Sequence, residues 1–146
     1  MKFSTKAMIA GFILAGGVAL AGGATDPDAK ARQDLMDSQG AAMKVLGGMA
    51  SGEVAFDAAA AAAAMKSLVD DAAQIPVAFK NQGAADPKSA AKPEIWTNWA
   101  AFVENAADLG KAAAALDATS LDGVKAGIGA IGGACKACHT DFKAAT

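Results

Sequence analysis

Apolar residues near the C-terminus recur with the period of an α-helix, and this regularity constrains the fold more than any other feature of the sequence. The spacing alternates between four and three residues through Val124, Ile128, Ile131, Cys135, Cys138 and Phe142. Such spacing places all of these side chains on one face of a helix. We therefore predict a helix that begins after Thr119 or Ser120 and buries this face.

The rest of the chain also favours helices over strands. It contains no tyrosine, few β-branched residues and no sustained alternation of apolar and polar positions. Beyond the N-terminal segment, its hydrophobic content is mainly alanine, the strongest helix former. Three further helices are expected, over about 26–48, 54–74 and 93–116. We predict an all-α fold, an antiparallel four-helix bundle.

Familiar helix signals set these boundaries. Asp26-Pro27 is a capping residue followed by proline at the first helical position. Gly47-Gly48 is a plausible stop for the first helix, and Pro76 for the second. Pro93-Glu94 opens the third helix after a polar loop over residues 81–92.

The N-terminus has the outline of a secretory signal. Lys2 and Lys6 precede an apolar stretch over residues 7–21 that ends in Ala19-Leu20-Ala21, a small-x-small pattern. A retained membrane anchor is the competing interpretation, but the stretch is short and rich in small residues. We expect residues 1–21 to be cleaved, leaving a single domain over 22–146 in the periplasm with no stable membrane insertion.

Charge excludes one class of partner. The formal net charge is −2, and the acidic and basic residues are scattered along the chain. A nucleic-acid-binding protein needs a basic patch or stripe, which this sequence lacks. We therefore expect no nucleic-acid partner.

The strongest chemical signal is Cys135-Lys136-Ala137-Cys138-His139. Two thiols three residues apart lie on one face of a helix, where each can form a thioether with one vinyl group of a porphyrin. The histidine that follows can turn its imidazole toward the iron. The pattern predicts one covalently attached haem c, bound by Cys135, Cys138 and His139.

Three other interpretations of this motif are weaker. A disulfide at this spacing would close only a tiny loop and stabilise little. A thioredoxin-like pair needs a βαβ setting, and here the cysteines lie late in a helix. Zinc needs four protein ligands, or three and a water molecule, and this chain has one histidine and two cysteines in total.

Two residues of the first helix are candidates for the opposite side of a haem. Met36 carries a thioether, a suitable soft ligand for haem iron, although methionine more commonly fills gaps in a core. Met43, Met49 and Met65 are expected to be such fillers. Arg32 lies one turn before Met36 and could pair with a haem propionate or remain solvated.

The mature chain resembles the class II c-type cytochromes, exported four-helix bundles whose haem motif lies near the C-terminus. Besides residues 135–139, the matching segments are Arg32-Gln33-Asp34-Leu35-Met36 and Pro93-Glu94-Ile95-Trp96. The run over residues 35–47 is particularly similar to the low-spin cytochrome c-556 branch. The resemblance implies that Met36 is the sixth iron ligand and that Arg32 lies near the haem.

The resemblance also frames the function. It implies an electron-transfer protein that exchanges electrons with redox partner proteins and is not an enzyme. The alternative is a five-coordinate cytochrome c′ that binds nitric oxide or carbon monoxide. Many cytochromes c′ have arginine where this chain has Lys143, which weakens the transfer of their gas chemistry. Either a monomer or a homodimer is compatible with the sequence.

Overall fold

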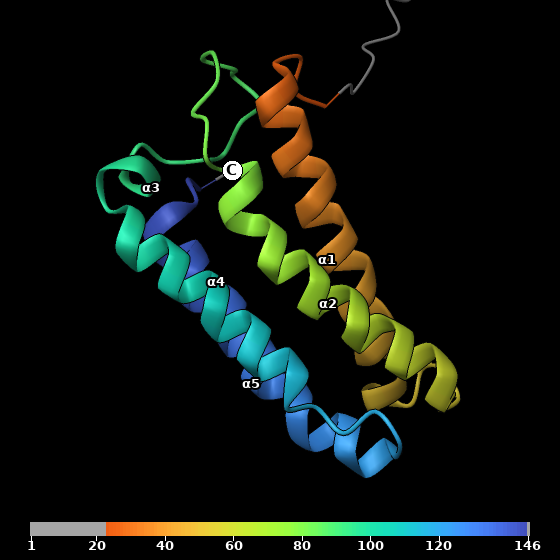
Figure 1. Cartoon of the computed structure of the whole chain (residues 1–146). Helices are drawn as coiled ribbons and strands as arrows, with labels where there is room; N and C mark the ends of the chain where they lie inside the picture. Colours follow the sequence, from red (N-terminus) through yellow and green to blue (C-terminus); the bar gives the residue numbers. More distant parts are fainter. Residues whose placement is uncertain (1–22, 146) are drawn as a thin grey trace, which may run out of the picture.

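The computed structural model describes residues 23–145, which form four long helices and one short helix (Figure 1). The predicted leader, residues 1–21, lies outside the described residues. Within them there is no strand, only an isolated bridge between Ala91 and Lys143. The helices are α1 (Pro27–Ser51), α2 (Ala58–Ala78), α3 (Glu94–Thr97), α4 (Trp99–Ala114) and α5 (Leu121–Phe142).

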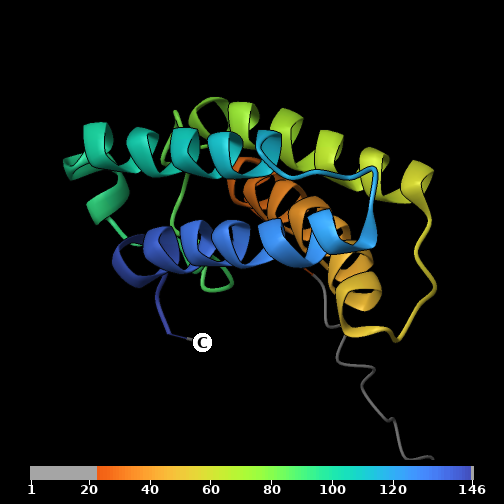
Figure 2. The same cartoon turned by 90° about the horizontal axis from the view of Figure 1, so that it is seen from below.

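The four long helices run alternately up and down the bundle, as Figures 1 and 2 show. Helix α1 packs against α2 and α5, and α4 packs against the same two neighbours. The prediction of an all-α antiparallel four-helix bundle is confirmed.

Three of the long helices begin at side-chain caps. The carboxylate of Asp26 accepts a hydrogen bond from the Ala29 amide at 2.9 Å, and that of Asp57 accepts one from Ala60 at 3.0 Å. At α5, the Ser120 hydroxyl accepts the Gly123 amide at 3.0 Å. Each cap gives a partner to an amide that the helix itself cannot satisfy. The predicted starts at Asp26 and Ser120 are confirmed.

The predicted end of the first helix at Gly47-Gly48 is wrong. Helix α1 continues to Ser51 and ends at Gly52, whose φ of 80° lies in the left-handed region. Gly48 is instead needed for a close approach, because a Cβ there would lie 3.1 Å from Cγ2 of Val54. The turn after α1 therefore folds back against the helix at Gly48.

The second helix also differs from its predicted range. It begins at Ala58, after the Asp57 cap, rather than at Val54, and it continues through Pro76 to Ala78. The Phe79 amide still donates to the Ile75 carbonyl at 3.0 Å, and both side chains are buried. Their burial keeps the last turn helical despite the proline.

The segment predicted as one helix over 93–116 is divided at Asn98. This residue has φ −126° and ψ 48°, which are not helical, and it separates α3 from α4. The break lies between Trp96 and Trp99, both partly buried against the core. Each indole ring packs against the core on its own side of the break, where the helix changes direction. The apolar spacing in the sequence does not reveal this break.

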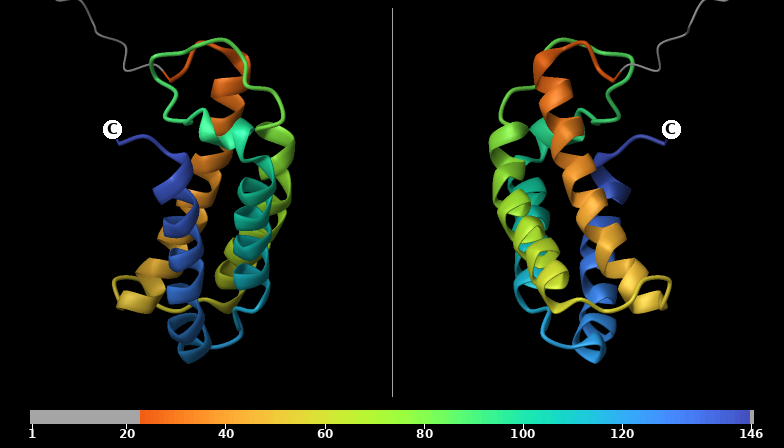
Figure 3. Two further views of the ribbon diagram at one scale, coloured as in Figure 1. Left: turned by 90° about the vertical axis from the view of Figure 1, so that its left-hand side faces the viewer. Right: turned by 90° about the vertical axis from the view of Figure 1, so that its right-hand side faces the viewer.

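One end of the bundle is closed by the loop over residues 80–93, which lies beside the start of α1 and the end of α5 (Figure 3). Asp86 accepts hydrogen bonds from the Thr25 amide and the Asp26 amide. The Lys92 amide donates to the Phe142 carbonyl at 3.0 Å, and the Ala144 amide to the Ala90 carbonyl at 2.8 Å. The loop is therefore held to both chain ends.

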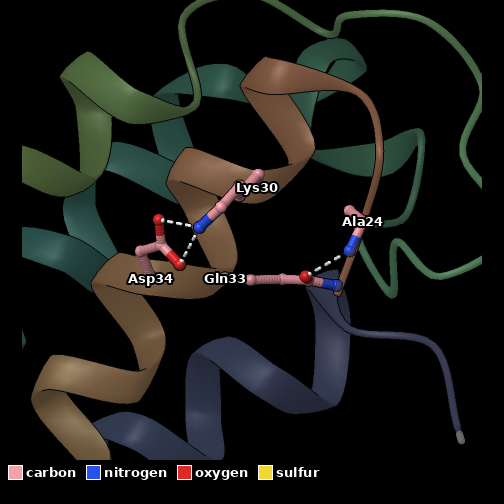
Figure 4. Close-up of polar contacts among 4 residues, drawn as sticks. All are labelled: Ala24, Lys30, Gln33 and Asp34. Carbon is pink, nitrogen blue, oxygen red and sulfur yellow. Dashed lines mark hydrogen bonds and ion pairs between the residues drawn. The ribbon is translucent and has the colours of Figure 1, made fainter. Parts of the chain in front are cut away.

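Side chains at the start of α1 add local contacts, drawn in Figure 4. The Ala24 amide donates to Oε1 of Gln33 at 2.8 Å, which folds the chain preceding α1 back onto the helix. Lys30 and Asp34 form an exposed ion pair one turn apart, with Nζ and Oδ2 separated by 2.6 Å.

Candidate haem site

A cavity of about 390 Å³ opens inside the end of the bundle that the loop closes. Its walls come from all four long helices, and much of the lining is alanine, leucine, isoleucine and phenylalanine. All five predicted site residues line it: Arg32 and Met36 from α1, and Cys135, Cys138 and His139 from α5. Residues about a hundred positions apart in the sequence are thus brought to one cavity.

The two cysteines are partly buried and are not joined by a disulfide. Burial raises the pKa of Cys138 to about 11, with smaller contributions from Cys135 and Asp141. Burial likewise raises the pKa of Cys135 above its usual value of 9.0. Both side chains are therefore neutral thiols near pH 7, whereas a thioredoxin-like pair needs a low-pKa thiolate.

His139 lies near the C-terminal end of α5 with an exposed side chain. Loss of hydration, together with the positive charge of Lys143, lowers its pKa below the usual 6.5. The imidazole is therefore neutral at physiological pH and keeps a nitrogen lone pair for a metal ion.

Met36 lies on the α1 side of the cavity. Among the methionines of residues 23–145, it alone contributes to the lining. Met49 is buried in the core, and Met43 and Met65 pack against it. Met36 therefore differs in position from these three methionines, which do not line the cavity.

Arg32 is not solvated, because only 4% of its surface is exposed. Its guanidinium lies 5.5 Å from the ring centroids of both Phe79 and Trp96, at cation–π distance. Nη1 donates to the Asn81 carbonyl at 2.9 Å, and Nη2 to the Gln82 carbonyl at 3.2 Å. Arg32 thus anchors the loop, and its buried Nε has no partner.

The sequence analysis missed Gln39. This residue lines the cavity from α1 with 6% of its surface exposed, and its buried Nε2 has no hydrogen-bond partner. A signal was available, since Gln39 lies three residues after Met36 and three before Ala42, and this spacing places it on one helix face with these two apolar residues. A polar side chain at such a position is unusual.

Aromatic rings form another part of the lining. Phe102 lies between Phe79 and Phe142, with centroid distances of 5.0 Å and 5.3 Å. The Trp96 indole nitrogen donates to the Phe79 carbonyl at 2.8 Å, which fixes the turn at the end of α2. The aromatic wall is therefore held by packing and by a hydrogen bond.

Two other kinds of site are not found in the described part of the chain. Within residues 23–145, no three histidine, cysteine, aspartate or glutamate side chains gather in a way that could hold a metal ion. No helix in this range is long and apolar enough to cross a membrane.

Known proteins similar to this chain share its length and fold. Cytochrome c′ of Rhodopseudomonas palustris is 36% identical over 141 residues, which cover 94% of each protein. Cytochrome c-556 of Agrobacterium fabrum is 34% identical over 146 residues, covering 98% of this chain and 95% of that protein. The structure of R. palustris cytochrome c′ superposes with a TM-score of 0.71 at 33% identity, covering 82% of this chain and 97% of that one.

The sequence model of the family described as cytochrome c′ matches residues 28–143, from the first turn of α1 to just beyond α5. This range contains α2 to α5, all of α1 except Pro27, and every residue named above as lining the cavity. The chain therefore belongs to the cytochrome c′ family, the class II c-type cytochromes, whose cofactor is covalently bound haem c.

Proposed function

We propose that this chain is a periplasmic electron-transfer protein whose haem is attached to Cys135 and Cys138 and whose iron is ligated by His139 and Met36. One observation carries this proposal: these four residues, from α1 and α5, line a single cavity. Iron in such a haem alternates between the ferrous and ferric states, and histidine–methionine ligation favours potentials useful to an electron carrier.

The residues present fit a haem. The cavity is mainly apolar, as a porphyrin face requires, and the unpartnered Nε of Arg32 is a donor suited to a propionate. Neutral thiols and a neutral imidazole have the protonation states from which thioethers and an iron–nitrogen bond are made. The protein's own contribution is to hold these groups and to keep water from the porphyrin.

Arg32 enters this proposal in a narrower role than the sequence indicated. Each of its terminal nitrogens already donates one hydrogen bond to a loop carbonyl. We propose that Arg32 contacts a propionate through Nε while it continues to anchor the loop. Export through a cleaved leader over residues 1–21 rests on the sequence pattern.

A second candidate function is the binding of nitric oxide or carbon monoxide at a five-coordinate iron. The 36% identity to a protein named cytochrome c′ favours it. In that case Met36 would be apolar lining, and the α1 side of the iron would be open. The two functions differ in whether the Met36 sulfur is bound to iron.

Optical spectra of the purified ferric and ferrous holoprotein test the proposal, with Met36→Ala as the variant and Met43→Ala as the control. We expect a low-spin spectrum with a methionine–iron charge-transfer band that Met36→Ala abolishes and Met43→Ala retains. Carbon monoxide should bind readily only to Met36→Ala. A high-spin native spectrum with ready carbon monoxide binding would instead establish the second function.

A further inference from the structure

We propose that Gln39 donates a hydrogen bond from Nε2 to the sulfur of Met36 when that sulfur is bound to iron, and thereby favours the ferrous state. This inference rests on the proposed ligation by Met36. In this role Gln39 is a positioning and tuning residue, since it acts on the iron through its ligand.

The first observation is an unsatisfied donor. Nε2 of Gln39 is buried and has no partner among the described residues, and the side chain lines the cavity. Leaving a buried amide without a hydrogen bond is costly, and most such groups in native proteins have a partner. The acceptor is therefore expected among the groups that meet in this cavity once it is filled.

The position of Gln39 along α1 indicates which of these groups can accept its hydrogen bond. Arg32, which lines the cavity and donates to the loop carbonyls of Asn81 and Gln82, marks its polar end. Gln39 lies seven residues beyond Arg32, which is about 10 Å deeper along a helix that rises about 1.5 Å per residue. The unpartnered Nε of Arg32 at the polar end is suited to a propionate, so the deeper Gln39 needs another acceptor.

Met36, three residues before Gln39, offers an acceptor atom in the same cavity. Residues three positions apart on a helix lie side by side, and both Met36 and Gln39 line the same cavity. A thioether sulfur is a weak acceptor with two lone pairs, so one remains free when the other binds iron. A donor at that lone pair withdraws electron density from the sulfur, which stabilises the electron-rich ferrous iron more than the ferric iron.

The experiment compares holoproteins carrying Gln39→Leu, which removes the donor, with Gln74→Leu, which makes the same change at an exposed position of α2. At a fixed ambient potential, we expect Gln39→Leu to lower the ferrous-to-ferric ratio roughly threefold to tenfold, as the loss of one hydrogen bond allows. Gln74→Leu should leave the ratio unchanged. The methionine–iron band should persist in both variants, which verifies that each is folded and ligated.

A direct readout comes from nuclear magnetic resonance of the reduced native protein labelled with ¹⁵N. Contact between the Gln39 side-chain amide and the Met36 methyl group, with slow exchange of an amide proton, would support the proposal. A native methionine–iron band combined with an unchanged ratio in Gln39→Leu would overturn it while leaving the proposed function intact.

A native protein without the band would remove the proposed ligation itself, and the assignment of Gln39 would fall with it. The effect of Gln39→Leu on the rate of carbon monoxide dissociation would then show whether Nε2 of Gln39 donates a hydrogen bond to a ligand bound from solution. The two failures are therefore distinguishable by the native spectrum alone.

Discussion

Asp86 shows how many contacts one partly buried side chain can organise. Its carboxylate accepts the amides of Thr25, Asp26 and Lys88 and also the Thr25 hydroxyl. These donors, the Asp26 amide first, lower its pKa from the usual 3.8 to about 2. All of them favour the charged carboxylate, so the contacts of the loop with the start of α1 depend on its ionisation.

The depressed pKa gives the acid dependence of stability a definite sign. The contribution of Asp86 is fully present above about pH 4 and is lost as pH falls toward 2, because the unfolded chain binds the proton more readily. We expect Asp86→Asn to flatten the fall in unfolding free energy between these pH values. Urea titrations followed by circular dichroism at several pH values would measure it.

Asp34→Asn is the matched control for this titration. Asp34 makes only an exposed ion pair with Lys30, and such pairs contribute little to stability. A slope between pH 4 and pH 2 that is the same in Asp86→Asn and in the native protein would contradict the assigned role of Asp86.

For single residues, the sequence predicted which side chains line the cavity but not all of the contacts that they make. Cys135, Cys138 and His139 could be placed together because their spacing brings them close on one helix. Met36 was placed opposite them mainly by the resemblance to class II c-type cytochromes. The loop contacts of Arg32 could not be predicted, since its partners lie 49 and 50 residues away and are backbone carbonyls. Every residue of the loop has a backbone carbonyl, so the sequence does not indicate which two accept hydrogen bonds from Arg32.

The positions of the helix ends depend both on local sequence signals and on packing against neighbouring helices. Capping side chains were readable because their chemistry is local, as Asp26 and Ser120 illustrate. Gly47-Gly48 and Pro76 were misleading, because burial against neighbouring helices outweighs a local helix preference of about 1 kcal/mol for glycine and about 3 kcal/mol for proline. The actual end of α1 depends on the backbone conformation of Gly52.

Two glycines of α1 should respond to alanine with opposite signs. At Gly52, φ is 80°, so a Cβ costs about 1 kcal/mol of unfolding free energy. At Gly40, in the helix interior, a Cβ would meet nothing within 4 Å, and Gly40→Ala should stabilise the protein by up to about 1 kcal/mol. Thermal unfolding of the two variants would measure both effects, and a gain in stability from Gly52→Ala would contradict this account.

For the whole molecule, stability depends on a core in which large apolar side chains are packed together with alanines. The largest fully buried side chains are Leu46, Leu68, Ile95, Ile131 and Val124. Buried alanines such as Ala61, Ala64 and Ala113 lie among the larger side chains and let the backbones approach closely. Removing one of the large side chains therefore leaves a cavity that little else can fill.

Leu68→Ala tests this dependence. Leu68 is 0% exposed in the middle of α2, and its truncation should lower the unfolding free energy by about 2–5 kcal/mol. Val77→Ala, on the same helix with 66% of its surface exposed, should change stability by no more than about 0.5 kcal/mol. Chemical denaturation of the holoproteins would compare them, and equal effects would contradict the assigned core.

The loop that joins both chain ends has a consequence for the order of folding. Its contacts connect residues about 50 to 60 positions apart, as between Thr25 and Asp86, or Lys92 and Asp141. At the opposite end of the bundle, the turns over 52–57 and 115–120 connect neighbouring helices directly. Contacts between distant residues form slowly because a long chain segment must first be confined. The two hairpins, α1–α2 and α4–α5, can therefore form early from the short-turn end, and the cavity end closes last.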